Sequence, residues 1–340
     1  MRRKSVVFIF VFFTLMAQAV KVNVQNAVDF VQPLMGSDSD HGLSTGNTYP
    51  AIAMPWGMNF WVPQTGKMGD GWQYTYAAKK IRGLKQTHQP SPWINDYGQF
   101  SLMPVVGKPV FDEEQRASWF SHKAEKATPY YYRVYLADYD VTAELCPTER
   151  AALMAFTFPK TDSAHVVIDA FDKGSYIKIL PDQRKVVGFS TRNSGGVPAN
   201  FRNYFVIEFD HDFDAVLSVK DGEYQEGHEQ EGNHVGAIIS FKIGKRGEKV
   251  QARVASSFFS EEQAWLNIQE LGQADMEQLC QQGRNRWNEV LGKIEVEDEN
   301  IDHLRTFYSC LYRSVLFPRA FYEKNSAGEI VHYSPYNGTI

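Results

Sequence analysis

Residues 250–266 read VQARVASSFFSEEQAWL, and the pattern of the chain changes inside this stretch. Up to Phe258, β-branched and small residues are spaced as in a strand. Beyond it, Ser260 and Gln263 stand three residues apart, which is typical of a capping box at the start of a helix. The stretch therefore predicts that a β-rich region ends near residue 257 and that helices follow.

On the N-terminal side of this point, short β-rich runs alternate with turn residues such as 193–196 (NSGG) and 221–222 (DG). The clearest runs are 130–136 (YYYRVYL), 165–171 (HVVIDAF), 204–209 (YFVIEF), 235–243 (VGAIISFKI) and 250–258 (VQARVASSF). Because no long helical pattern separates them, a parallel sheet with crossover helices is disfavoured. The runs predict a mostly β protein built on a large antiparallel sandwich.

Three helices are predicted after residue 257, and core packing is the first interpretation of their apolar stripes. The stripe residues are Trp265, Ile268 and Leu271, then Met276, Cys280, Trp287, Val290, Leu291 and Ile294, and then Ile301, Leu304, Tyr308, Leu311 and Val315 over 299–317 before Pro318. A strand follows over 328–333 (GEIVHY). Little helical chain is present to cover these stripes, so we expect poorly protected C-terminal helices and a sequence that is interrupted at Ile340.

Length and charge restrict the classes of function. A chain of 340 residues predicts about two domains. The net charge of −5 and the pI near 6.0 offer no basic surface for phosphate groups, so nucleic acid is not an expected partner. Aromatic residues make up 14% of the chain, enough that some can face a ligand while most pack in the core.

The first residues read as an export signal. Three basic residues at 2–4 precede an apolar run over 6–16, and 17–19 form an A-x-A cleavage site. A retained membrane anchor is the alternative, but this run is shorter than the roughly 20 residues that span a bilayer. We therefore predict a signal peptide over 1–19, a periplasmic or secreted protein, and no membrane attachment after cleavage.

The three cysteines are widely spaced and form no C-x-x-C pair. Cys146, Cys280 and Cys310 support neither a zinc site nor a disulfide framework, and small core residues are the first interpretation. A disulfide between Cys280 and Cys310 remains an alternative in an oxidising compartment.

Four loop segments concentrate polar and aromatic residues near one end of the predicted sandwich. They are 36–49 (GSDSDHGLSTGNTY), 55–61 (PWGMNFW), 69–76 (GDGWQYTY) and 84–98 (LKQTHQPSPWINDYG). A sugar ring presents hydroxyls at its edge and C–H groups on its face, so Trp faces beside His, Asn and Asp suit it. The loops favour a sugar over a phosphate or an apolar ligand.

Other chemistries find less support in the same loops. The acidic turn 38–40 resembles the start of a calcium loop, but the remaining EF-hand ligand positions are absent, which favours a solvated turn. His41 and His88 would need a third ligand to hold zinc, so we predict no metal site from local spacing. Neither a phosphate-binding glycine motif nor a G-x-S-x-G elbow occurs.

These residues also carry a family resemblance. The segments are 46–61 (GNTYPAIAMPWGMNFW), 71–104 (GWQYTYAAKKIRGLKQTHQPSPWINDYGQFSLMP), 307–321 (FYSCLYRSVLFPRAF) and the final YSPYNGTI. With these motifs the chain resembles glycoside hydrolase family 92, the calcium-dependent exo-acting α-mannosidases. The similarity runs over essentially the whole chain after the signal.

The resemblance implies an N-terminal β-supersandwich joined by linker helices to an (α/α)6 barrel, with the active site between the two domains. It divides this chain into a supersandwich over 20–257, linker helices over 258–297 and the beginning of the barrel over 298–340. It also implies inverting hydrolysis of terminal α-mannosides by a general acid and a general base, with a calcium ion on the mannose hydroxyls.

In the family, the acid, the base and the calcium-associated residues belong to the barrel domain. We therefore expect no catalytic residue within 1–340, no activity from this chain alone, and calcium ligands mainly outside it. The substrate-binding residues that the motifs imply are His88, Trp93 and Asp96, with Trp72 and Asn47 as further candidates for contact with a mannose-containing glycan. The missing barrel domain is the implied partner.

Two other classes of protein stay open at this point. A non-catalytic carbohydrate-binding β-sandwich would bind mannosides without any barrel. A structural or protein-docking sandwich would bind no sugar at all.

Overall fold

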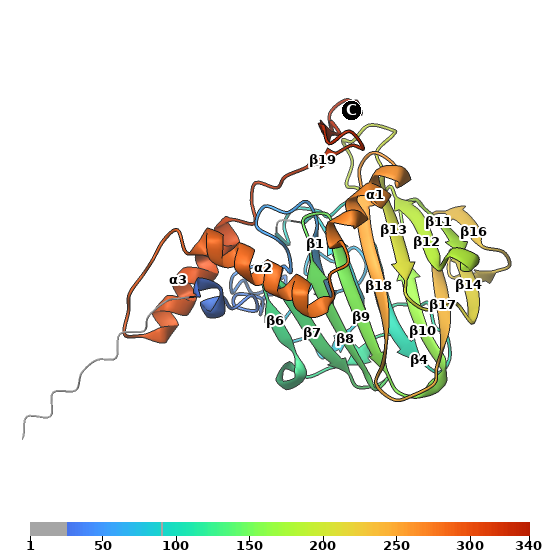
Figure 1. Ribbon diagram of the computed structural model, residues 1–340, viewed down its shortest axis with the longest axis horizontal. Coiled ribbons are helices and arrows are strands. Elements are labelled where there is room, and N and C mark those ends of the chain that lie inside the picture. Colours follow the sequence, from blue (N-terminus) through green and yellow to red (C-terminus); the bar gives the residue numbers. More distant parts are fainter. Residues whose placement is uncertain (1–25, 90) are drawn as a thin grey trace, which may run out of the picture.

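Two large antiparallel sheets face each other in a computed structural model that describes residues 26–89 and 91–340 (Figure 1). The predicted signal peptide lies outside the described residues. The smaller of the two sheets has seven strands, in the order β1 (Phe60–Gln64), β3 (Gly83–Thr87), β4 (Ser101–Val106), β10 (Thr161–Asp169), β17 (Val235–Ile243), β14 (Ala215–Lys220) and β15 (Glu223–Gln225).

The larger sheet has nine strands and covers the first one. Its order is β16 (Glu229–Gly232), β11 (Ser175–Leu180), β12 (Lys185–Ser190), β13 (Asn203–Phe209), β18 (Glu248–Ser257), β9 (Ala151–Phe158), β8 (Val141–Pro147), β7 (Tyr131–Leu136) and β6 (Lys126–Thr128). Buried side chains such as Met154, Val166 and Ile239 fill the space between the sheets. This is the packing that two half-buried sheets need in order to remove their apolar faces from water.

Several short elements complete the β region. They are the pairs β2 (Lys80–Ile81) with β5 (Ser118–Trp119) and β19 (Tyr322–Lys324) with β20 (Ile330–His332), and the 3-10 turns η1 (Ala27–Phe30), η2 (His122–Ala124), η3 (Pro181–Gln183) and η4 (Ile268–Leu271). The mostly β, antiparallel prediction is confirmed. The five predicted runs coincide with β7, β10, β13, β17 and β18 to within a few residues at their ends.

The helices are α1 (Glu261–Asn267), α2 (Met276–Leu291) and α3 (Ile301–Ser314). At α1 the Ser260 hydroxyl accepts from the Gln263 amide at 3.2 Å, as predicted. The Gln263 side chain does not return to Ser260 but donates to Asn267 and to the Lys324 carbonyl, so only half of the predicted capping box is present. A complete capping box begins α2, in which the N-cap residue Asp275 exchanges hydrogen bonds with Gln278, the third residue of the helix.

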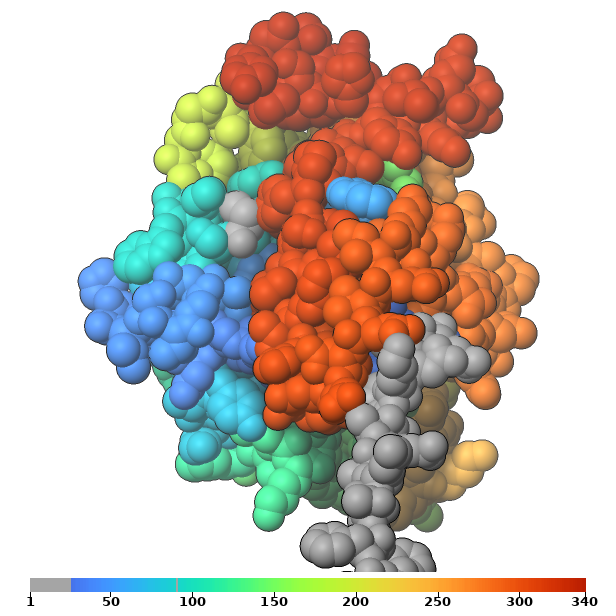
Figure 2. All heavy atoms as spheres, turned by 90° about the vertical axis from the view of Figure 1, so that its left-hand side faces the viewer, coloured from blue at the N-terminus to red at the C-terminus, as the bar shows by residue number. Residues whose placement is uncertain are grey.

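The apolar stripes of α2 and α3 are largely covered, although Ile294 and Ile301 stay exposed. The expectation that these helices are poorly protected stays a prediction. Trp287 and Tyr312 are fully buried, and they donate to the carbonyls of Ala53 (2.9 Å) and Ala51 (2.5 Å). The covering surface is the N-terminal segment around η1 together with the loop before β1, and not another helical layer. Figure 2 shows this side of the molecule, with the orange helices beside the blue N-terminal loops.

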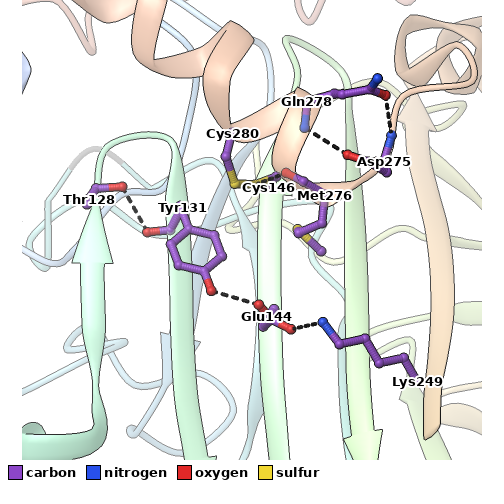
Figure 3. The surroundings of a disulfide bond; sticks show 9 residues. All are labelled: Thr128, Tyr131, Glu144, Cys146, Lys249, Asp275, Met276, Gln278 and Cys280. Carbon is purple, nitrogen blue, oxygen red and sulfur yellow. Dashed lines mark hydrogen bonds and ion pairs between the residues drawn. A yellow bond between two sulfur atoms is a disulfide. The ribbon is translucent and has the colours of Figure 1, made fainter.

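A disulfide joins Cys146, near the end of β8, to Cys280 in α2 (Figure 3). Their Cα atoms lie 5.9 Å apart although 134 positions separate them in the sequence. The bridge that we left open between Cys280 and Cys310 is wrong, because Cys310 is a free, exposed residue of α3. The bond fastens α2 to the outer face of the nine-stranded sheet.

Within residues 26–89 and 91–340, no helix combines the length and the apolar character needed to cross a bilayer.

The disulfide gives a first prediction. Cys280→Ala should lower the midpoint of thermal unfolding, because losing a native bridge across a long loop costs about 2–5 kcal/mol. Adding a reductant to the wild-type chain should bring its midpoint to that of the variant. Cys310→Ala is the control and should unfold like the wild type; equal midpoints for all three chains, with and without reductant, would contradict the bridge.

Candidate functional site

A polar cavity of about 440 Å³ lies among loops at one end of the sandwich. It is lined by Gly69, Asp70, Gly71, Gln89, Asn95, Asp96, Gln99, Lys173, Arg192, Asn193, Ser194 and Gly195. These residues come from the loop before β2, the loop between β3 and β4, the turn after β10 and the loop between β12 and β13. Loops from both sheets therefore meet around one hollow.

Glycines allow these loops to touch. A side chain at Gly71 would come within 2.5 Å of the Pro92 carbonyl, and one at Gly69 within 2.8 Å of the Arg192 guanidinium. The Gly98 amide donates to the Arg192 carbonyl at 2.9 Å and ties the loop between β3 and β4 to the loop between β12 and β13. At Gly71 the opposite backbone is so close that it leaves no room for a Cβ atom.

Two buried side-chain amides leave acceptors free in this cavity. Gln89 and Gln99 are each 1% exposed, and their Oε1 atoms have no hydrogen-bond partner among the described residues. Buried polar atoms are nearly always paired, so a partner is expected from outside the protein chain. Neutral carbonyl oxygens accept well from hydroxyl groups.

Charged side chains on the cavity wall are largely matched within the protein. Arg192 forms an ion pair with Asp172. Burial lowers the pKa of Arg192, although Asp96, Asp169 and Glu113 act in the opposite direction. The wall thus offers polar contacts without a large excess of either charge.

Asp96 is bound from several sides. Its carboxylate pairs with Lys85 at 3.1 Å and accepts from the Thr87 hydroxyl at 2.8 Å. It also accepts from the backbone amides of His88 and Tyr97, at 2.8 and 2.9 Å. Burial alone would raise its pKa, but Lys85 and these hydrogen bonds lower the pKa of Asp96 overall. The residue is held ionised, and it closes the loop that carries Trp93.

His88 lies behind the cavity wall and not in it. Its ring is 1% exposed, stacks on Tyr97 with centroids 5.0 Å apart, and bonds the Tyr97 carbonyl (2.8 Å) and Asn59 (3.1 Å). Burial and the nearby Arg319 charge lower the pKa of His88 to about 4. The ring is therefore neutral near pH 7, so it carries one N–H and can donate to only one of these two oxygens.

Trp93 and Trp72 stand together beside the cavity. Trp93 is 60% exposed and lies edge-to-face with Trp72, with ring centroids 5.1 Å apart. His41 completes the group, 5.7 Å from Trp72 and 6.0 Å from Trp93. Because Gly71 and Pro92 precede the two Trp residues and are in contact, the exposed ring lies next to the polar hollow.

Asn47 lies in the preceding loop in the left-handed region, with φ +51°. The backbone amide of Asn47 donates to the Ser39 hydroxyl at 3.2 Å, and the buried side-chain Oδ1 has no partner among the described residues. In the same loop Asp40 accepts from the amides of Gly42 and Leu43, as in an ordinary Asx turn. Of the five predicted substrate-binding residues, only Asp96 lines the hollow. Trp72 directly follows the lining residue Gly71, and Trp93 lies on the same loop as Asp96, whereas His88 and Asn47 do not line it.

Sequence reasoning missed the loop between β12 and β13, which supplies Arg192 and Asn193. We read its glycines as a breaker between strands, and nothing in their spacing indicates that β12 ends beside β3. Gln89 and Gln99 were also missed. Gln86 of β3 holds the loops in place with two hydrogen bonds, one to Asn203 of the other sheet (2.9 Å) and one to the Gly98 carbonyl of the loop between β3 and β4 (3.2 Å).

Glu323 is a second carboxyl group with an unusual environment. Burial raises the pKa of Glu323, a property shared with many general acids. However, the side chain is fully buried, and its oxygens accept from the Phe258 amide (3.0 Å) and the Asn267 side chain (2.5 Å). It fastens β19 to the sandwich and cannot reach a ligand in the polar cavity.

The calcium ion that the resemblance implies needs a group of oxygen ligands. In the part of the chain that the structure describes, no three His, Cys, Asp or Glu residues are grouped so that they could hold a metal ion. The described residues therefore do not fit a calcium ion, and we assign none of them as its ligand.

Comparison with known families places the chain. The model of the glycosyl hydrolase family 92 N-terminal domain matches residues 30–257, and that of the family 92 catalytic domain matches residues 263–340. The solved family GH92 inverting mannosidase BT2199 from Bacteroides thetaiotaomicron VPI-5482 is 46% identical, with a TM-score of 0.90. That match covers 94% of this chain and 43% of the mannosidase.

Two further proteins are similar to this chain over most of its length. The α-mannosidase BT3965 from the same organism, solved in complex with mannoimidazole, is 25% identical with a TM-score of 0.78, over 91% of this chain and 43% of its own. A protein of Arthroderma benhamiae described as an uncharacterized secreted glycosidase is 23% identical over 87% of this chain and 42% of its own. The chain thus spans less than half the length of each relative. Since the N-terminal-domain match alone covers more than half of the chain, the chain belongs to glycoside hydrolase family 92.

Proposed function

We propose that this chain is the N-terminal part of a secreted or periplasmic inverting exo-α-mannosidase that removes terminal α-mannosides from glycans. The observation that carries the proposal is the Trp72–Trp93 pair standing beside a polar cavity with free amide oxygens. The fungal relative's description as secreted and the export signal over 1–19 support the compartment. The domain boundaries near 257 and 297 stay part of this proposal.

Each proposed substrate-binding residue has a role that its surroundings suggest. Trp93 offers an exposed face to the C–H side of a mannose ring, and Trp72 supports it. Asp96 lines the hollow and holds the loop, while Asn47 offers its free amide oxygen from the neighbouring loop. His88 acts from behind, because its ring is buried against Tyr97 and Asn59 and cannot reach a ligand hydroxyl.

Neither Asp96 nor Glu323 suits the two roles that inversion needs. A general acid must be protonated near the leaving oxygen, and a general base must activate water on the other side of the sugar. Asp96 is held ionised by Lys85, and Glu323 is enclosed in the core. We therefore place both catalytic groups, and the calcium that would contact mannose hydroxyls, outside this chain.

Catalysis can be assayed directly. The purified 340-residue chain should show no hydrolysis of an aryl α-mannoside with calcium present, because neither catalytic carboxyl group is within it. Clear turnover that disappears in Asp96→Asn or Asp70→Asn would overturn this assignment.

Sugar binding separates the remaining alternatives. Trp93→Ala should weaken binding of methyl α-mannoside by about fivefold or more, as expected for an exposed aromatic contact. Ligand-observed NMR titration of the chain suits the weak binding that half of a pocket provides. Trp119→Ala is the matched control, since Trp119 is 51% exposed on β5 and should leave binding unchanged.

Other results of that titration would favour the rival classes. Tight mannoside binding by the chain alone would favour a complete carbohydrate-binding sandwich. No binding, with Trp93→Ala altering nothing but stability, would favour a structural sandwich.

The Lys85–Asp96 pair predicts a large effect on stability. Asp96→Asn leaves the 4%-exposed Lys85 as an uncompensated buried charge, which costs about 3–5 kcal/mol. Chemical denaturation of the two single variants and of Lys85→Met/Asp96→Asn measures the coupling. The double variant should regain part of the lost stability, and Asp70→Asn, at an exposed position of the same cavity, should lose little. Additive losses would show that the two side chains do not interact.

A further inference from the structure

A buried ion pair lies beside the turn that follows β10. Arg116 and Asp169 are both buried, and the Arg116 Nη2 atom lies 2.7 Å from the Asp169 Oδ2 atom. The other carboxylate oxygen of Asp169 accepts from the His234 ring at 2.7 Å and from the Phe171 backbone amide at 2.9 Å. Burial would raise the pKa of Asp169, but Arg116 and His234 lower it overall. The carboxylate is thus ionised, and it joins three segments that lie far apart in the sequence.

The turn that this carboxylate holds is strained. Phe171, Lys173 and Gly174 have positive φ angles, of +62°, +69° and +102°. Only glycine adopts this region at little cost, so the other two residues need outside contacts to stay in it. The bond from the Phe171 amide to Asp169 is one such contact. On the other side, the Gly174 amide donates at 3.0 Å to the Asn233 carbonyl, in the segment between β16 and β17.

The same turn forms part of the wall of the polar cavity. Lys173 lines the cavity, and Asp172 pairs with Arg192, which lines it as well. The Thr191 hydroxyl donates to the Lys173 carbonyl at 2.9 Å, and the Thr191 amide donates to the Gly174 carbonyl at 2.9 Å. The turn after β10 is thus attached to the loop after β12, so a shift of the turn would move Arg192.

A further contact leads from the turn to Asp96. The Lys85 ammonium group lies 5.6 Å from the centre of the buried Phe171 ring, and it pairs with Asp96 at 3.1 Å. Asp96 is another lining residue of the polar cavity. Asp169 is therefore connected to three lining residues, although it does not line the cavity itself.

We propose that Asp169 is a positioning residue for the polar cavity, held in place by Arg116 and His234. It does not touch the ligand. It fixes the strained turn, so that the wall residues keep the positions that a sugar needs. Supporting residues of this kind are what keep a binding site within about 0.5 Å of its productive geometry. The inference rests on the sugar-binding function proposed above.

The affinity of the 340-residue chain for methyl α-mannoside tests this role. Asp169→Asn should weaken binding by about threefold or more, because an amide turns N–H groups toward Arg116 and holds the turn less firmly. His234→Ala should also weaken binding, whereas His234→Gln keeps an N–H donor for the carboxylate and should restore it. Glu323→Gln is the matched control, since it alters a buried carboxyl group away from the cavity and should keep the wild-type affinity.

A loss of stability can also weaken binding, and a double variant separates the two effects. Arg116→Met/Asp169→Asn removes the uncompensated buried charge, so it should unfold at a higher temperature than Asp169→Asn. It should still bind methyl α-mannoside as weakly as Asp169→Asn, because the Phe171 amide still lacks its carboxylate. Affinity that recovers together with stability would contradict the positioning role. If Asp169→Asn does not fold, the pair His234→Ala and His234→Gln decides.

Amide hydrogen exchange of the ligand-free chain keeps the test independent of the proposed function. Peptides over 170–176 and 189–195 should exchange faster in Asp169→Asn and His234→Ala than in the wild type or in Glu323→Gln. If the wild type binds no mannoside, the proposed function fails, and exchange alone decides the role of Asp169. Wild-type exchange over 189–195 in the folded variants would overturn the proposal, and so would wild-type mannoside affinity in those variants.

Discussion

The structure depends on one requirement: each large sheet must bury an apolar face, and the other sheet supplies the surface that buries it. Seven strands and nine strands therefore face each other across a continuous core. The outer face of the nine-stranded sheet still carries apolar residues such as Leu153 and Val206, and α1 and α2 cover them. Loops at one end of the sandwich do not take part in this packing, so their side chains can face a ligand.

Such loops need their own means of staying in place, and here it is a satisfied polar network. Asp96 gathers Lys85, Thr87 and two backbone amides, and His88 connects Tyr97 to Asn59. A buried network of this kind specifies one arrangement because losing any member leaves another group unpaired. Asp96 and His88 thus anchor the segment that carries the exposed Trp93.

Much of the fold could be predicted, because strands and helices leave periodic patterns. The run that became β7 alternates, and the stripes of α2 and α3 recur at helical spacing. The disulfide could not be predicted, since it depends on α2 crossing β8, which no local pattern encodes. For the candidate site, the sequence showed the residue types but not the direction in which each side chain points. A loop has no periodicity to show that His88 points inward while Trp93 points outward.

The free acceptors of the polar cavity are connected to the helices that follow the sandwich. Gln89 leaves its side-chain oxygen free in the cavity, and its backbone carbonyl accepts from the Tyr49 hydroxyl at 2.5 Å. The Tyr49 carbonyl in turn accepts from Arg313 of α3 at 3.4 Å. A firmly packed α3 therefore restricts Gln89 through Tyr49, and this reduces the ordering cost that a hydroxyl-bearing ligand meets in the cavity.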